Sequence, residues 1–449
     1  MKAYSEYVDA PLPWLSEIPS HWELARNKNI FQEVKDVVGE NADAYPLLSL
    51  TTKGIILRDV ASGKGKFPKD FNTYKIVKHG DMVFCLFDID ETPRTVGLSD
   101  YDGMLTGAYT IFHVSNVNLR FAYYYYLSLD NVKAMRPLYS GLRKTINVGT
   151  FLGTKLPVPP RPEQDQIVRF LDWKVASINR LINIKKAEIK RLEELKLSQL
   201  FAIVTQGLNE KVELIDSGIE HIGLVPSHWK VLLNHRIYKE NCRSFSGDET
   251  VLSLSQKDGL LPYVEMKERS LHTASYENWK LVLPNDLVLN RFKAHLGVFF
   301  SSNYRGIVTF HYGVYEPIMK VSSKYYEVLF HTPKYKQVFA GASNGMTVGL
   351  QNLSNANFYK VYTVYPPYEE QCAIVAEVQK IENQMQAIIS TISKEIGILH
   401  EFKTRLISDV VTGKIDVRGI EIPEYEFVEE NVDTENEESM EEVEGETYE

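Results

Sequence analysis

Few residues of this chain stand at spacings that could support catalysis. An amino-methyltransferase places Asn or Asp before Pro-Pro-Tyr or Pro-Pro-Phe, because that side-chain oxygen must accept a hydrogen bond from the amine. Here Tyr365 precedes Pro366-Pro367-Tyr368, and its phenol cannot take that role. The chain has neither a Walker loop nor a glycine-rich loop after an early strand, so nucleotide-driven translocation and cofactor binding are not predicted. We expect no catalytic residue and no cofactor.

Metal-dependent cleavage is no better supported. Glu265-Met266-Lys267 is a three-residue nuclease-like match, but Glu401-Phe402-Lys403 matches equally well inside a predicted helix, so the pattern has little weight. Asp88, Asp90 and Glu91 are close in sequence. A second copy of this segment, identified below, instead carries Asn290, Arg291 and Lys293, which makes a shared metal site improbable. Cys85, Cys242 and Cys372 are scattered singly, so neither a zinc site nor a disulfide framework is predicted. We expect no metal.

Two long segments with helical periodicity organise the rest of the chain. Residues 163–206 contain no proline or glycine, and at ~1.5 Å per residue they would extend roughly 65 Å. Residues 370–412 show the 4-3 apolar alternation of a coiled coil. Prolines precede both segments, and Gly207 and Gly413 follow them, which predicts helix ends at these positions. Each helix therefore needs a partner along its length, and the other helix can supply it.

The two helices belong to an internal repeat. Pro159-Pro160 and Glu163-Gln164 recur 207 residues later as Pro366-Pro367 and Glu370-Gln371. Pro19-Ser20-His21-Trp22 recurs at the same displacement as Pro226-Ser227-His228-Trp229, which favours a structural role for this motif over catalysis. The chain is therefore predicted to contain two similar halves.

Within each half, short runs rich in β-branched and aromatic residues predict strands, interrupted by one or two helices. The predicted strands are Leu47 to Leu50, Met82 to Phe87, Tyr109 to Val114, Val251 to Leu254, Leu287 to Leu289 and Val308 to Tyr312. The predicted helices are Arg120 to Leu129 and Lys324 to His331, whose tyrosines (Tyr123 to Tyr126, Tyr325 and Tyr326) fit a core better than a base-stacking surface.

The fold class is α+β: two strand-rich globular domains, each followed by a long α-helix, with the helices paired as an antiparallel coiled coil about a pseudo-twofold axis. The helix length would then set the separation of the domains. The predicted boundaries are 1–158 for the first domain, 159–207 for its helix, 208–365 for the second domain, 366–415 for its helix and 416–449 for a tail.

Charge is unevenly distributed. The net charge is −9, but residues 421–449 hold 14 acidic residues and no Lys or Arg, so residues 1–419 are mildly basic, at about +5. We expect the acidic tail to be disordered. The amino terminus lacks a signal-peptide core, and no run of ~18 apolar residues occurs, so we expect a soluble cytoplasmic protein without membrane association.

Two motifs give the chain a family resemblance. Residues 216–229, Asp-Ser-Gly-Ile-Glu-His-Ile-Gly-Leu-Val-Pro-Ser-His-Trp, resemble the segment that leads into a domain of a type I restriction–modification specificity subunit. The Pro-Pro-x-x-Glu-Gln opening of each helix, at Pro159 and Pro366, resembles the same family. In the first half the lead-in segment departs from the pattern, with Val8 to Trp14 in its place.

The resemblance implies a non-catalytic subunit. Each globular domain would be a target-recognition domain that reads one half of a bipartite sequence in double-stranded DNA. The helices would set the spacing and dock methyltransferase subunits, two in number. Restriction subunits would join through the assembled complex, and methylation and cleavage would reside on these partners. The alternative is a coiled-coil scaffold whose domains bind proteins without reading bases.

Basic and amide side chains in predicted turns are the candidate DNA contacts, because Arg pairs with guanine, Asn with adenine and Lys with phosphate. The glycine turns around residues 141 and 345 would let the backbone approach phosphates. The candidates are Arg58, Lys64, Lys66, Lys69, Arg94, Arg143 and Lys144 in the first half, and Lys257, Arg269, Arg291, Lys293, Arg305 and Asn344 in the second.

Overall fold

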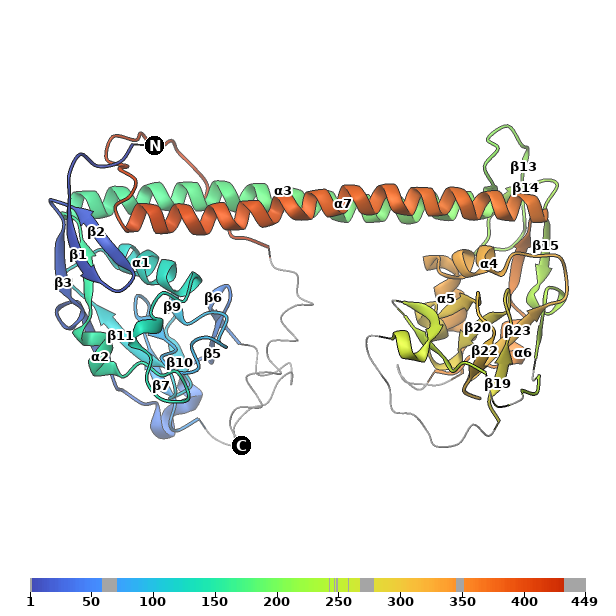
Figure 1. Cartoon of the computed structure of the whole chain (residues 1–449), viewed down its shortest axis with the longest axis horizontal. Coiled ribbons are helices and arrows are strands. Elements are labelled where there is room, and N and C mark those ends of the chain that lie inside the picture. The colour runs from blue at the N-terminus through green and yellow to red at the C-terminus, as the bar shows by residue number, and fades with distance from the viewer. Residues whose placement is uncertain are drawn as a thin grey trace. The chain divides into compact units, whose positions relative to one another are not determined.

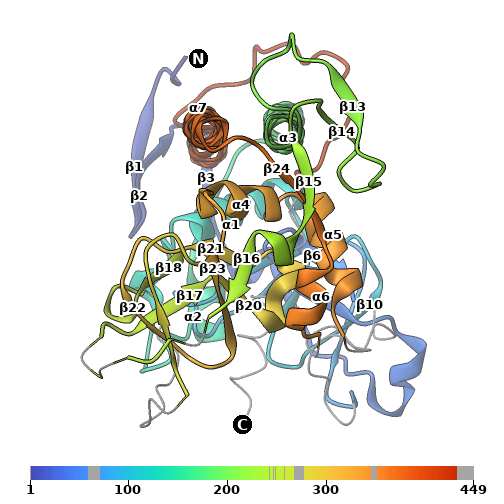
Figure 2. The same ribbon diagram turned by 90° about the vertical axis from the view of Figure 1, so that its right-hand side faces the viewer.

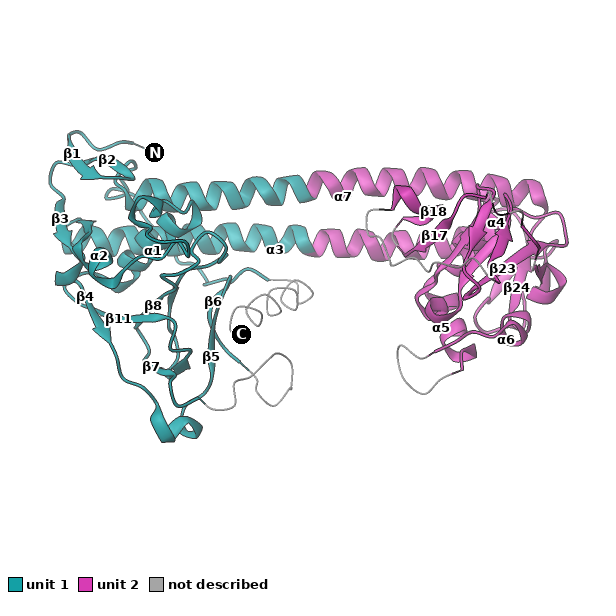
Figure 3. Cartoon of the chain, turned by 60° about the horizontal axis from the view of Figure 1, so that its bottom comes forward, with its two compact units in different colours: residues 1–186, 393–449 teal, residues 187–392 magenta. Residues whose placement is uncertain are grey.

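The computed structural model describes residues 2–58, 71–241, 243–245, 247, 249–256, 258–266, 278–344 and 351–431. The chain forms two compact units, Met1–Lys186 with Ser393–Glu449 (unit 1) and Ala187–Ile392 (unit 2), coloured separately in Figure 3. Each unit mixes short strands with helices. These units divide the chain differently from the predicted domain boundaries, because each long helix contributes one part to each unit.

Unit 1 is built around a four-stranded antiparallel sheet in the order β4-β11-β8-β9. Two-stranded pairings β1-β2, β3-β12, β5-β6 and β7-β10 surround it (Figure 1). The strands are β1 Tyr7–Leu12, β2 Leu15–Pro19, β3 Glu23–Arg26, β4 Phe31–Val34, β5 Leu48–Thr51, β6 Gly54–Leu57, β7 Lys75–Val77, β8 Met82–Phe84, β9 Val96–Leu98, β10 Gly103–Leu105, β11 Thr110–Val114 and β12 Lys155–Val158. The helices are α1 Leu119–Asn131, α2 Val148–Gly153, the first part of α3 Arg161–Gln206 and the last part of α7 Tyr368–Val411.

Unit 2 has a four-stranded antiparallel sheet in the order β16-β23-β20-β21, with pairings β13-β14, β15-β24, β17-β18 and β19-β22. Its strands are β13 Leu214–Asp216, β14 Leu224–Pro226, β15 Lys230–Leu233, β16 Tyr238–Glu240, β17 Leu252–Ser255, β18 Gly259–Pro262, β19 Lys280–Val282, β20 Leu287–Asn290, β21 Phe299–Ser301, β22 Gly306–Val308, β23 Tyr312–Pro317 and β24 Tyr362–Tyr365. Its helices are the last part of α3, α4 Ser323–Phe330, α5 Pro333–Ala342, α6 Asn355–Tyr359 and the first part of α7.

Aromatic side chains fill the space between each sheet and its helices. In unit 1, Phe84 and Phe112 from the sheet meet Tyr126 of α1 and Phe151 of α2, all fully buried. In unit 2, a comparable cluster contains Phe299, Tyr315, Phe330, Phe339 and Phe358. Of the tyrosines predicted to belong to the core, Tyr124 to Tyr126 with Tyr325 and Tyr326 are buried, and Tyr123 is partly buried against the same core, so this part of the sequence interpretation is confirmed.

One predicted strand is wrong. Residues 309–311, inside the predicted strand Val308 to Tyr312, form a turn between β22 and β23, in which the Tyr312 amide donates to the Thr309 carbonyl. Phe310 at this turn is half exposed, so its apolar character, which suggested a strand, does not reflect burial.

The long helices lie side by side within each unit (Figures 1 and 2). In unit 1, Ile167 and Leu171 near the start of α3 share a core cluster with Leu406 and Val410 near the end of α7. In unit 2, Leu200 and Val204 near the end of α3 share a cluster with residues near the start of α7, including Ile374 and Val378. The helix segments are therefore antiparallel within each unit. Gly207 and Gly413 follow the helices with φ of 78° at both positions, as their sequence positions predict.

The helix-opening motifs hold each unit against its helix. In unit 1, the buried Glu163 carboxylate accepts hydrogen bonds from Tyr4 Oη at 2.6 Å and Trp22 Nε1 at 3.1 Å, and lies 2.8 Å from His21 Nε2. Burial, together with this carboxylate, raises the pKa of Tyr4. Gln164 accepts from the Asn118 amide at the start of α1 and donates to the Pro159 carbonyl.

Unit 2 repeats the arrangement. Glu370 accepts from Trp229 Nε1 at 2.9 Å and lies 2.8 Å from His228 Nε2. Gln371 accepts from the Ser322 amide and donates to the Pro366 carbonyl. The Ser-His-Trp and Glu-Gln motifs therefore act together as structural joints.

Residues 416–431, here called the C-terminal strap, differ from the disordered tail that composition predicts. Asn179 and Asn183 of α3 donate their side-chain amides to the carbonyls of Val428 and Glu429, and Gln166 donates to those of Val417 and Ile420. The Glu430 carboxylate lies 3.1 Å from Lys186 Nζ of α3, and 2.7 Å from Lys403 Nζ and 3.3 Å from His400 Nε2 of α7. The strap therefore spans both helices of unit 1, and residues 432–449 of the predicted tail lie outside the described residues.

Candidate nucleic-acid interface

Two loops meet at one end of the unit 1 sheet. One is the connection from β8 to β9, residues 85–95, and the other is the turn from Ser140 to Thr145, which closes with a pair of backbone hydrogen bonds. The Ile146 amide donates to the Leu86 carbonyl at 2.8 Å, and the Asp88 amide donates to the Arg143 carbonyl at 3.0 Å. Backbone bonds thus fix the two loops to each other before any side chain contributes.

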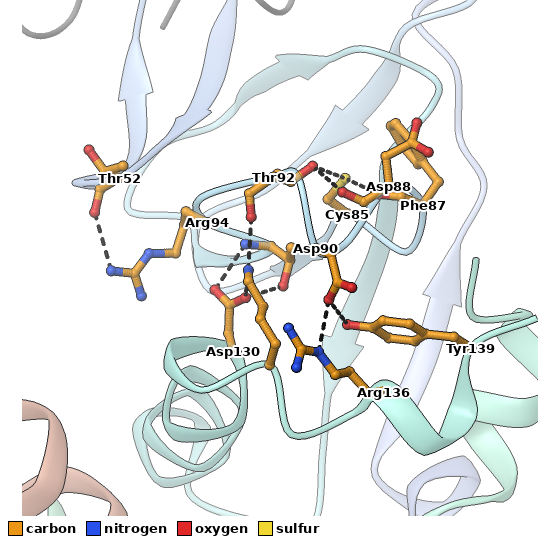
Figure 4. A network of polar contacts seen from close by, with 12 residues as sticks. Thr52, Cys85, Phe87, Asp88, Asp90, Thr92, Arg94, Asp130, Arg136 and Tyr139 are labelled. Carbon is orange, nitrogen blue, oxygen red and sulfur yellow. Dashed lines mark hydrogen bonds and ion pairs between the residues drawn. The ribbon is translucent and has the colours of Figure 1, made fainter. Parts of the chain in front are cut away.

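Opposite charges reinforce this pairing. Arg143 lies 2.5 Å from Asp88, and Lys144 lies 3.2 Å from Asp90 and 2.9 Å from Glu91. Arg136 also contacts Asp90 at 3.1 Å (Figure 4). Although desolvation opposes it, hydrogen bonding from Lys144 and Arg136 lowers the pKa of Asp90. The three cations remain between 41% and 65% exposed, so each can hold the loop and still reach a phosphate.

The buried carboxylate of Asp130 also holds the β8–β9 loop in place. Asp130, at the end of α1, accepts from the Thr95 amide at 2.9 Å and from Thr95 Oγ1 at 2.5 Å (Figure 4). Lys133 lies 2.7 Å from the same carboxylate and donates to the Thr92 carbonyl. The end of α1 therefore determines where the β8–β9 loop lies.

Unit 2 has an equivalent pair of loops. The connection after β20 forms a short 3-10 helix, Arg291–Leu296, and the Leu353 amide donates to the Arg291 carbonyl at 3.0 Å. Asn344 and Asn352 form the antiparallel bridge that corresponds to Ser140 and Thr145. In each unit, two loops are therefore joined by a backbone hydrogen bond at the end of a β-hairpin of the four-stranded sheet, β8–β9 in unit 1 and β20–β21 in unit 2.

The chemistry of the two pairs differs. In unit 2 the Arg291 guanidinium turns inward to Glu240 at 2.5 Å and Asn355 at 2.8 Å, and its side chain is 22% exposed. The Arg291 guanidinium therefore stabilises the loop and is not available for a bidentate contact with a base. Lys293 is exposed on the same loop, and Asn344 accepts from Asn357 Nδ2 at 3.3 Å.

The structure brings together some of the sequence-predicted residues. Arg143 and Lys144 meet in unit 1, and Arg291, Lys293 and Asn344 lie in the loop pair of unit 2. Arg94 ends the β8–β9 loop and donates to the Thr52 carbonyl of the β5–β6 turn. Arg58 follows β6, and Arg305 precedes β22 and pairs with Glu249 at 3.4 Å, so neither belongs to the segments that form the loop pairs. Lys64, Lys66, Lys69, Lys257 and Arg269 lie outside the described residues.

Arg136 and Lys133 were not selected from the sequence. They follow α1, and their partners in the β8–β9 loop lie 41 and 46 residues earlier in the chain: the Thr92 carbonyl for Lys133 and the Asp90 carboxylate for Arg136. Their positive charge was visible in the sequence, but their proximity to the β8–β9 loop depends on the fold.

Other kinds of site have no support in the part of the chain that the structure describes. No three His, Cys, Asp or Glu side chains there are grouped so as to hold a metal ion. None of the helices described has both the length and the apolarity needed to cross a membrane.

The comparison with family models decides the domain type. Residues 64–191 match the family described as type I restriction modification DNA specificity domain. This segment of the chain is therefore similar to a type I DNA specificity domain. The resemblance to type I specificity subunits that the two sequence motifs indicated is thereby confirmed. The matched segment includes the β8–β9 loop, the Ser140 to Thr145 turn and the first part of α3.

Three solved structures are similar to this chain, and the first of them shares its fold. A chain from a structure described as "Structural basis underlying complex assembly and conformational transition of the type I R-M system" has 13% identity and a TM-score of 0.58, covering 89% of this chain and 99% of that one. The HsdS subunit from Thermoanaerobacter tengcongensis has 14% identity and a TM-score of 0.49, with 91% and 100% covered. The S subunit of a type I system from M. genitalium has 11% identity and a TM-score of 0.33, with 87% and 96% covered. No curated protein matches the chain.

Proposed function

We propose that this chain is the DNA-recognition subunit of a type I restriction–modification enzyme and that each unit reads one half of a bipartite target. The observation that carries the proposal is the repeated loop pair: after β8 in unit 1 and after β20 in unit 2, a backbone bond ties the connecting loop to a second turn. Two rigid loops at one sheet end can enter a groove and present side chains to base edges. Arg143, Lys144, Lys293 and Asn344 are the described candidates for these contacts, whereas Arg291 supports them.

The helices would hold the two reading units at a fixed separation. The local antiparallel packing of α3 and α7 in each unit supports an antiparallel coiled coil along their whole length. With 46 residues in α3 and 44 in α7, such a pair would act as a spacer at ~1.5 Å per residue. The two units would then be a tandem repeat related by a pseudo-twofold axis.

Catalysis would come from partner chains. In this assignment two methyltransferase subunits dock on the helices, and restriction subunits join through the assembled complex. The chain itself would contribute binding energy and sequence preference to double-stranded DNA. The two halves of the target would be separated by base pairs that the protein does not contact.

A domain exchange tests this proposal. Methylome sequencing of a host that carries the complete system would give the bipartite motif. Exchange of residues 20–150 for the corresponding domain of another specificity protein should then change one half-site and leave the other half-site intact. Mobility shifts of the purified complex on duplexes carrying either motif would check this result. An unchanged motif after the exchange would favour the protein-binding scaffold instead.

Lengthening the spacer gives a second prediction. A seven-residue insertion after Lys186 in α3, matched by one before Ser393 in α7, keeps the heptad register and adds about 10 Å. We expect the preferred gap between half-sites to grow by about three base pairs at ~3.4 Å each, with both half-sites unchanged. Methylome sequencing measures the gap. Insertion in α3 alone is the control and should prevent assembly, because α3 then gains about 10 Å that α7 does not, and the joints at the two ends of the helices cannot both form.

A further inference from the structure

Leu142 is an apolar side chain presented to solvent in the candidate interface. It lies at the tip of the Ser140 to Thr145 turn and is 103% exposed, more than any other large hydrophobic side chain in the described part of the chain. A single exposed leucine is common on protein surfaces and has no meaning by itself. Its significance here depends on how the turn is held and on what surrounds it.

The turn is fixed rather than loose. Ser140 and Thr145 exchange backbone hydrogen bonds at 2.9 and 3.0 Å, and Ser140 Oγ donates to the Thr145 carbonyl. Gly141 has a φ of 70°, which favours glycine at the first position of the tip. The Arg143 carbonyl and side chain are both bound to Asp88, and Lys144 is bound to Asp90 and Glu91. The backbone on either side of Leu142 is therefore preorganised, with the side chain projecting from it.

The surroundings of this tip indicate its binding partner. Arg143 and Lys144 follow Leu142 directly, and Arg136 joins the same network through Asp90. A protein partner with an apolar pocket would have to bury these charges, whereas a nucleic acid offers phosphates to the cations and base faces to the leucine. Asp88, Asp90 and Glu91 balance these three cations, so the argument for DNA rests on the exposure of the cationic side chains, which can exchange a carboxylate for a phosphate, and not on net charge.

The second half of the chain carries the same residue pattern. Asn344, which forms the bridge equivalent to that of Ser140, is followed by Gly345-Met346, as Ser140 is followed by Gly141-Leu142. Met346 lies outside the described residues, so its equivalence is one of sequence position. In sequence, a glycine and then a large apolar residue that is not branched at Cβ follow the bridge residue in both halves, although the residues after them differ.

We propose that Leu142 is a wedge that enters the DNA at a base step of the first half-site while Arg143 and Lys144 contact the flanking phosphates. Leucine and methionine are among the side chains that partly unstack base steps in this way. The wedge would favour flexible pyrimidine–purine steps, so it would add to sequence preference without hydrogen bonding to a base. This inference rests on the proposed DNA-recognition function.

Substitution of Leu142 by alanine tests the wedge in the complete complex with methyltransferase subunits. The probe is a duplex carrying the methylome-defined motif, with 2-aminopurine placed in turn at each purine position of the first half-site. We expect the wild-type complex to raise the fluorescence at one step, which reports unstacking. Leu142→Ala should abolish that rise and weaken binding to the motif by about ten- to a hundredfold.

The salt dependence separates the wedge from the phosphate contacts. Leu142→Ala should leave the slope of log affinity against log salt unchanged, whereas Lys144→Ala should reduce the slope by about one unit. Leu142→Met should retain the fluorescence rise. Val132→Ala, at another exposed apolar residue of unit 1, should behave as the wild type.

The outcomes distinguish the wedge from the function on which it rests. A wild-type complex without half-site preference overturns the proposed function and the wedge together. A wild-type complex with the preference, but without a local fluorescence rise or with a Leu142→Ala variant of equal affinity, overturns the wedge alone. Because Leu142 packs against nothing in the described structure, a folding defect is not expected to obscure the result, and circular dichroism of the variant checks this point.

Discussion

Replacement of Glu163 by alanine is expected to destabilise unit 1 by about 3 kcal/mol or more. The Glu163 side chain is 6% exposed, and its carboxylate is bound by Tyr4, His21 and Trp22. Removal of one partner from a buried charged network typically costs about 3–5 kcal/mol, because the remaining polar groups lose their hydrogen bonds without regaining water. Native-state hydrogen exchange, followed on peptides from each unit, would measure the change in unit 1 separately.

The repeat supplies a matched control. Glu370 holds the equivalent position in unit 2, where His228 and Trp229 contact it, but its side chain is 39% exposed. Water can replace part of its lost hydrogen bonding, so Glu370→Ala should cost only about 1 kcal/mol, and in unit 2 alone. Equal losses for the two variants would contradict the view that burial sets the strength of the unit 1 joint.

This joint also shows what the sequence could predict. The Ser-His-Trp and Glu-Gln motifs recur 207 residues apart, and the repetition indicated a structural role before their contact was known. The ends of α3 and α7 could be predicted from the prolines before and the glycines after them, because these residues restrict or permit particular backbone angles without help from the rest of the fold. The α1 and α4 helices, and several strands, followed from periodicity for the same reason. Such features depend on neighbours in the sequence.

The candidate interface depends instead on distant neighbours. Arg143 and Arg291 looked alike as turn cations, but Arg143 lies exposed beside Asp88, whereas Arg291 turns inward to Glu240. Glu240 lies on β16, 51 residues before Arg291, and only the strand order of the sheet brings the two together. The same argument applies to Phe310, whose place on a turn rather than a strand is set by the β22–β23 connection.

The C-terminal strap shows a different limit of composition. Averaged over residues 421–449, high acidity predicts a chain that repels itself. The average does not include the cations of α3 and α7, and it does not include Asn179 and Asn183, whose amides bind the backbone of the strap regardless of its charge. A segment with an unfavourable composition can therefore be ordered when a complementary surface lies in the same unit.

Truncation of residues 421–449 is accordingly expected to weaken unit 1 without changing the DNA sequence that is recognised. The deletion removes the hydrogen bonds of Asn179 and Asn183 and the Glu430 contacts with Lys186 and Lys403, together with the packing of Ile422. At roughly 0.5–1.5 kcal/mol for each net interaction, the expected loss is about 3 kcal/mol. Hydrogen exchange in α3 around Asn179 and Asn183 should rise most, since these side chains lose their partners directly.

The control is a shorter truncation, of residues 432–449, which removes nine acidic residues but keeps the strap. It should leave the exchange rates of α3 unchanged if the described contacts, rather than net charge, stabilise the helix pair. Methylome sequencing of both truncated systems should return the wild-type motif, because the strap contacts α3 and α7 and makes no bond to the β8–β9 loop or to the Ser140 to Thr145 turn within the described residues. A changed half-site in the longer truncation would mean that α3 transmits the state of the strap to the reading loops, and would require the strap to be counted as part of the recognition apparatus.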